Sequence, residues 1–103
     1  MQLLLENGGA RVGGRKVAWP FARLTVSPEE LRLNVRLVGK FSFTPSDVEA
    51  LEALINYPLL GRGIRIHHQN PDYPELLVFY TLHHPIPILT RIKTFGFICL
   101  PEV

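Results

Sequence analysis

The run from Leu31 to Leu37 (LRLNVRL) constrains the fold most, because apolar and polar residues alternate along it without interruption. Its odd-numbered residues are all aliphatic, and its even-numbered residues are arginine or asparagine. Successive side chains of a β-strand point to opposite faces, so this period of two is typical of a half-buried antiparallel strand. The pattern predicts a strand whose aliphatic residues, Leu37 included, face the core.

Other short strands are predicted around this run, each bounded by turn-forming residues. Ser27–Glu30 carries Pro28 at the second position of a turn, and Gly39 ends the alternating run. Gly8–Gly9 and Gly13–Gly14 are predicted to be turns. The expected strands are 10–12, 21–26, 31–37, 40–43, 63–68 and 75–82, the last two forming a hairpin across the turn formers of 69–74.

The segment His83–Gly96 changes period. Its apolar residues recur at helical spacing, both prolines fall in the first turn, and Gly96 is placed to cap the last turn. We expect a helix over about Pro85–Phe95.

The residues alone leave Thr44–Tyr57 open between two structures. Ser46 followed by Glu49 is a capping-box pattern, and the abundant Glu, Ala and Leu favour a helix. The segment Val48–Ile55 also alternates, although neither of its faces is cleanly polar, which weakens the strand interpretation.

The bulk composition predicts one globular domain spanning residues 1–103. The chain is 47% hydrophobic and 19% charged, which argues against disorder. No apolar run approaches the ~18–20 residues that cross a bilayer, and the N-terminal residues lack the features of a signal peptide. A single cysteine, Cys99, precludes an internal disulfide. These features fit a cytoplasmic protein.

Charge is distributed unevenly. The net charge of +2 is weak for a nucleic-acid-binding protein, so no nucleic-acid partner is expected. Residues 10–43 nevertheless hold seven cationic side chains against two carboxylates, a local charge of +5. Solvated strand faces explain such an excess, and so does a surface for an anionic partner.

The four histidines form two adjacent pairs, His67–His68 and His83–His84, which suggests a metal site. In a strand, however, neighbouring side chains diverge, so His67 and His68 point to opposite faces. Pairing of His68 near Leu76 would put the two pairs about 23 Å apart, whereas zinc ligands lie ~2.0–2.1 Å from one ion. We therefore expect no metal and no cofactor.

Catalytic patterns are weak in this sequence. Cys99 has no histidine nearby in the chain, the few serines lie mainly beside prolines in turns, and the glycine pairs do not have phosphate-loop spacing. We do not expect an enzyme.

Several segments together resemble the small prokaryotic pleckstrin-homology-like (PH-like) domains. The carriers of this resemblance are GRKVAWPFARLTVSPEELRLNV, KFSFTPSDVEAL, GIRIHH with LLVFYTL, and PILTRIKTFGF. The resemblance implies a bacterial protein with a mainly β fold. That fold is a bent antiparallel sheet or half-open barrel of about seven strands, closed at one end by the C-terminal helix. It also implies that Val48–Ile55 is a strand.

The resemblance further implies a binding module that holds an anionic lipid headgroup or a protein partner at its first strands. The matching residues in this sequence are Arg11, Arg15, Lys16 and Arg23. The alternative is a structural protein that assembles with copies of itself, because the tail FICLPEV is apolar and we expect it to be exposed.

Overall fold

The computed structural model describes residues 3–57, 61–81 and 83–100, and these form eight strands and one helix. The mainly β prediction with a C-terminal helix is therefore confirmed, with one strand more than the expected seven or so. The elements are β1 (Leu4–Val12), β2 (Arg15–Val26), β3 (Leu31–Val35), β4 (Gly39–Phe43), β5 (Val48–Tyr57), β6 (Gly61–His68), β7 (Leu77–Tyr80), α1 (Pro85–Lys93) and β8 (Cys99–Leu100).

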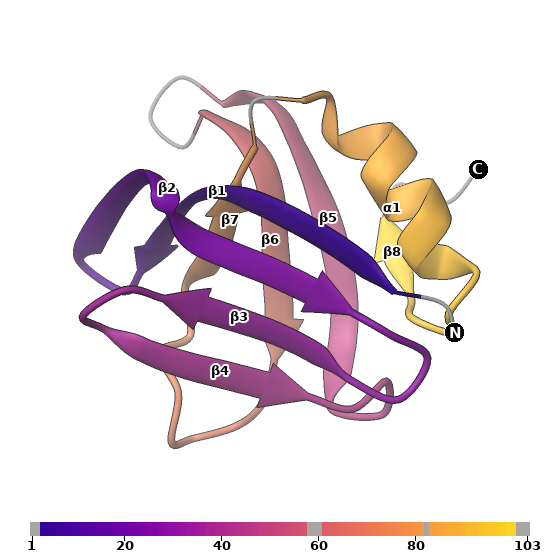
Figure 1. Ribbon diagram of the computed structural model, residues 1–103. Helices are drawn as coiled ribbons and strands as arrows, with labels where there is room; N and C mark the ends of the chain where they lie inside the picture. The colour runs from indigo at the N-terminus through magenta and orange to yellow at the C-terminus, as the bar shows by residue number, and fades with distance from the viewer. Residues whose placement is uncertain (1–2, 58–60, 82, 101–103) are drawn as a thin grey trace.

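One curled sheet contains all the strands, in the order β4-β3-β2-β1-β7-β6-β5-β8 (Figure 1). Neighbours are antiparallel except β8, which runs parallel to β5. The sheet forms a half-barrel, and α1 packs against β5, β6 and β8 at one end of it. The β1–β2 hairpin turn and the β3–β4 turn lie together at the opposite end, on the left of Figure 1.

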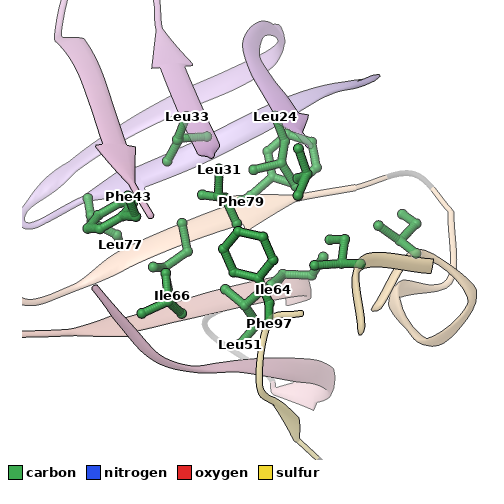
Figure 2. Close-up of a cluster of buried hydrophobic side chains, with 14 of the residues drawn as sticks. Leu24, Leu31, Leu33, Phe43, Leu51, Ile64, Ile66, Leu77, Phe79 and Phe97 are labelled. Atoms are coloured by element: carbon green, nitrogen blue, oxygen red, sulfur yellow. The ribbon is translucent and has the colours of Figure 1, made fainter. Parts of the chain in front are cut away.

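Aliphatic and aromatic side chains from the concave face of the sheet fill the interior, as Figure 2 shows. Leu33, Ile66 and Phe79 are completely buried there. The helix adds Ile88, Leu89 and Ile92 to the same cluster. One core therefore joins both halves of the sheet to the helix.

The open segment Val48–Ile55 is a strand, within β5. It pairs with β6 through Leu51 opposite Ile66 and Ala53 opposite Ile64, and Leu51 is fully buried. Residues 44–47 form a turn in which the Asp47 N–H donates to the Thr44 carbonyl. Burial between two strands outweighs the helical propensity of Glu, Ala and Leu here.

The helix begins at the predicted residue but ends two residues early. The Nδ1 atom of His84 accepts the N–H of Ile86 and caps the first turn. At the other end, i to i+3 bonds replace the helical ones from Thr94 onward. Gly96, predicted as the cap, follows this tightened turn with a φ of 103°.

The predicted β6–β7 hairpin is present, with Ile64 opposite Phe79. The extents differ, because β6 begins at Gly61 and β7 spans only Leu77–Tyr80. Nearer the N-terminus, β1 and β2 are longer than the predicted 10–12 and 21–26. Gly8–Gly9 lies inside β1 and not in a turn, because β2 and β7 pack closely against its backbone.

Two further predictions are wrong. Leu37 does not face the core: β3 ends at Val35, and Leu37 is 96% exposed in the turn that follows. The tail FICLPEV is not exposed as a whole. Phe97 and Cys99 enter the core, whereas Ile98 and Leu100 point outward, and residues 101–103 lie outside the described residues. Alternation continues into β8, which explains the division.

Candidate functional site

A hollow of about 650 Å³ lies between the start of β2 and the β3–β4 turn. We call it the basic groove. It is lined by Arg15, Lys16, Val17, Phe21, Arg36, Leu37 and Val38.

The groove exists because the pairing between β2 and β3 does not extend to the start of β2. Their ladder begins at the pair Ala22–Val35, and the N–H of Arg36 makes a last bond to the carbonyl of Phe21 at 2.9 Å. The chain then turns back into β4, with the N–H of Val38 donating to the carbonyl of Val35. Because β2 continues beyond this point with β1 on one side and no strand on the other, a hollow remains where a longer β3 would lie.

A bulge in β2 lies beside the hollow and contributes Phe21 to its lining. On β1, Gly8 is opposite Ala22 and Ala10 is opposite Val17, so the segment Ala18–Phe21 faces a single residue, Gly9. A Cβ at Gly9 would lie only 2.7 Å from the carbonyl oxygen of Val17. Glycine thus permits the close approach that pushes the extra β2 residues outward.

Leu37 is unusual at the rim of the groove. It has a φ of 66°, a conformation that costs energy in any residue with a Cβ. Leu37 is 96% exposed, so burial of its side chain does not offset that energetic cost. Trp19 and Phe21, at 54% and 45% exposed, place two more large apolar side chains at this end of the sheet.

The charge of the groove is entirely positive. Arg15, Lys16 and Arg36 are its ionisable residues, and none of its described lining residues is acidic. The Arg36 guanidinium lies 5.3 Å from the ring centroid of Phe21, and the Lys16 ammonium lies 5.6 Å from that of Tyr80. Aromatic faces therefore hold both cations without neutralising them.

The four sequence-predicted ligand residues separate into three places. Arg15 and Lys16 line the basic groove. Arg23 lines a neighbouring hollow of about 340 Å³, where its Nε donates to the Oδ1 of Asn7 at 3.2 Å. Arg11 is turned toward the hairpin, its Nε donating to the carbonyl of Gly13 at 3.3 Å. The structure thus brings together two of the four.

Arg36 is the cation that the sequence analysis left out of the site, and it lines both hollows. The alternation of residues 31–37 already directed it away from the core. The missing information was the register, which puts Arg36 opposite Phe21 and beside the bulge.

The histidines are dispersed, as predicted for His67 and His68. His68 is buried on the concave face, where its Nε2 donates to the carbonyl of Pro74 and its Nδ1 accepts the N–H of Asn70. His67 is on the convex face, with its Nε2 2.8 Å from Glu52 Oε1. Within the described residues, no three His, Cys, Asp or Glu side chains form a group suited to a metal ion.

Cys99 is buried in β8, and burial raises the pKa of its thiol above the usual range. A neutral, enclosed thiol is a poor nucleophile. Its sulfur lies 3.6 Å from the carbonyl oxygen of Leu89, a position suited to packing beneath the helix.

Comparison of the chain with protein-family models, curated proteins and solved structures finds no match. Among the described residues, no helix has the length and apolar character needed to cross a membrane.

Proposed function

We propose that this chain is a non-catalytic binding module of PH-like fold that receives an anionic partner in the basic groove. The observation that carries the proposal is the lining of the groove, where three cations and four apolar side chains surround one hollow without an acidic residue. Such a lining complements a partner that combines negative charge with an apolar part. The half-barrel and its C-terminal helix support the PH-like resemblance.

Two partner classes meet this description, namely an anionic lipid surface and an acidic protein segment. The exposed Leu37 and Phe21 would enter the apolar part of either partner, while Arg15, Lys16 and Arg36 would contact its charges. A cytoplasmic location is part of this proposal, because the single buried thiol suits a reducing compartment.

The test is binding of the full chain to two acidic surfaces. We would measure cosedimentation with vesicles of phosphatidylglycerol and phosphatidylcholine, and retention on immobilised polyglutamate. The wild type should bind at least one surface, and Arg15→Glu/Lys16→Glu should lose about ten-fold or more in affinity. Lys93→Glu, on the exposed side of α1, is the control for general charge and should retain binding. Absence of binding to both surfaces would contradict the proposal.

A second candidate function, self-assembly, is favoured by the β8 edge. Leu100, in the two-residue strand at the border of the sheet, is 37% exposed, and Ile98, just before that strand, is 54% exposed. Exposed apolar side chains on an edge strand suit pairing with a second copy. Size-exclusion mass measured at two concentrations tests this function, and a strictly monomeric protein that is unaffected by Ile98→Glu would count against it.

A further inference from the structure

The first half of β2 has an open edge. Within the described chain, Arg15–Val17 pair with β1 on one side only, Ala18–Phe21 form the bulge opposite Gly9, and the β2–β3 ladder begins at Ala22. The side chains of this stretch are exposed except that of Val17, which is partly buried. At about 3.3 Å per residue the paired stretch Arg15–Val17 spans roughly 10 Å, enough for a strand at the short end of the usual range to pair with it.

Backbone polar groups point out of this edge into the basic groove. A two-residue turn at Gly13–Gly14 closes the β1–β2 hairpin, so Val12 and Arg15 form a hydrogen-bonded pair, as do Ala10 and Val17. The N–H and C=O groups of the intervening Lys16 therefore face the open side. An added strand would find both donors and acceptors there.

Charge selects among the strands that could be added. Arg15 and Lys16 flank one end of the open edge, and Arg36 lies at the other end beside Phe21. A second copy pairing here through the same β2 segment would oppose arginine and lysine to their own kind, which is unfavourable. An acidic strand would pair with these cations, and its apolar residues would cover Phe21 and Leu37.

We propose that the basic groove binds an extended acidic peptide of a partner protein by strand addition to the open edge of β2. This inference rests on the proposed function and names its partner class. The peptide takes the place of a longer β3, with acidic residues near both ends and β-branched residues between them. A lipid headgroup matches the cations equally well, but its phosphate offers no hydrogen-bond donors for the outward C=O groups.

The test uses a fluorescein-labelled peptide, Glu-Glu-Val-Thr-Val-Thr-Val-Glu-Glu, whose charge pattern is the same in either strand direction. Fluorescence anisotropy with the full chain should show saturable binding. The same peptide with lysine in place of glutamate should not bind. Arg15→Glu/Lys16→Glu should weaken binding about ten-fold or more, whereas Lys93→Glu should change it less than about two-fold. Equal binding by both charge variants would overturn the inference.

Amide hydrogen exchange distinguishes strand addition from simple charge attraction. Saturation with the peptide should slow exchange at Lys16, and leave exchange at Leu33, inside the β2–β3 ladder, unchanged. Binding without protection at Lys16 would overturn strand addition. If phosphatidylglycerol vesicles bind in a manner that depends on Arg15 and Lys16 but the peptide does not, the inference is wrong and the proposed function stands. If neither binds, both are wrong.

Discussion

Two strand edges of the same half-barrel differ in whether other side chains cover them. At β4, Tyr73 of the β6–β7 loop covers the edge: its hydroxyl accepts the N–H of Ser42, and its ring lies 5.1 Å from Phe41 and 5.3 Å from Phe43. The ring of His68 adds a further contact with Phe43 at 5.1 Å. At β2, residues 15–20 have no β3 partner within the described chain, and the adjoining hollow is lined by Arg15, Lys16 and Arg36.

The difference between the covered β4 edge and the uncovered β2 edge suggests different roles for the two edges. Exposed strand edges attract unwanted partners, so folded proteins cover them or charge them. The cover over β4 is aromatic and ties the two halves of the sheet together. Under our proposal, the edge of β2 keeps backbone groups available for a partner of opposite charge. We therefore assign stability to the β4 edge, which we call the sealed edge, and binding to the open edge.

The largest expected effect is at the sealed edge. Phe43 is 1% exposed and contacts both His68 and Tyr73. Phe43→Ala should lower the free energy of unfolding by about 3–5 kcal/mol, because it leaves a cavity in the core. Phe21→Ala at the open edge, where the side chain is 45% exposed, should cost less than about 1 kcal/mol. Urea denaturation measures both, and similar losses would break the comparison.

The glycine pair at the β2 bulge gives the next effect. A Cβ at Gly8 would overlap the carbonyl oxygen of Tyr80 and lie 2.8 Å from the Phe79 ring. Gly8→Ala should therefore cost about 2–3 kcal/mol, since a backbone group cannot move aside cheaply. A Cβ at Gly14 would meet nothing within 4 Å, so Gly14→Ala is the control and should leave the thermal midpoint nearly unchanged. A stable Gly8→Ala protein would show that β1 and β7 are not held this closely.

The sequence predicted the parts of the fold that depend on alternation alone. Residues 31–35 and the convex row of Arg32 and Asn34 are where period two puts them. Leu37 could not be placed, because the residue at which a strand stops depends on the turn geometry of its neighbour. For β5, composition favoured a helix, and only the need of β6 for a partner strand makes the segment extended.

Two of the four predicted site residues line the groove, and strand register explains why the other two do not. Arg15 and Lys16 are adjacent to the hairpin that created the expectation, and they line the groove. Arg11 and Arg23 share their segment but not their surroundings, because the bulge after Val17 shifts the register between them. Register is a property of two strands together, and a single strand's pattern does not contain it.

A smaller effect is expected from the Tyr73 hydroxyl. Tyr73→Phe removes the acceptor of the Ser42 N–H but keeps the ring contacts with Phe41 and Phe43. The loss should be about 0.5–1.5 kcal/mol. Exchange at the Ser42 amide should accelerate more than exchange at Leu33, which lies inside the β2–β3 ladder. If Ser42 exchanges at the wild-type rate in the variant, the hydroxyl does not seal the edge.

The smallest effect concerns the link from the sealed edge to β5. The Oδ2 of Asp47 accepts the backbone N–H of Thr44 at 3.0 Å, and this bond holds the pKa of the carboxyl below its usual 3.8. A carboxyl whose pKa is lower in the folded state contributes stability above its unfolded pKa and loses it as the pH falls through the folded pKa. Asp47→Asn keeps an acceptor oxygen but removes the titration. The variant should thus be slightly less stable than the wild type at pH 6, and the difference should be smaller at pH 2. Denaturation at both pH values measures this, and a constant difference would mean that the turn does not depend on the ionised carboxylate.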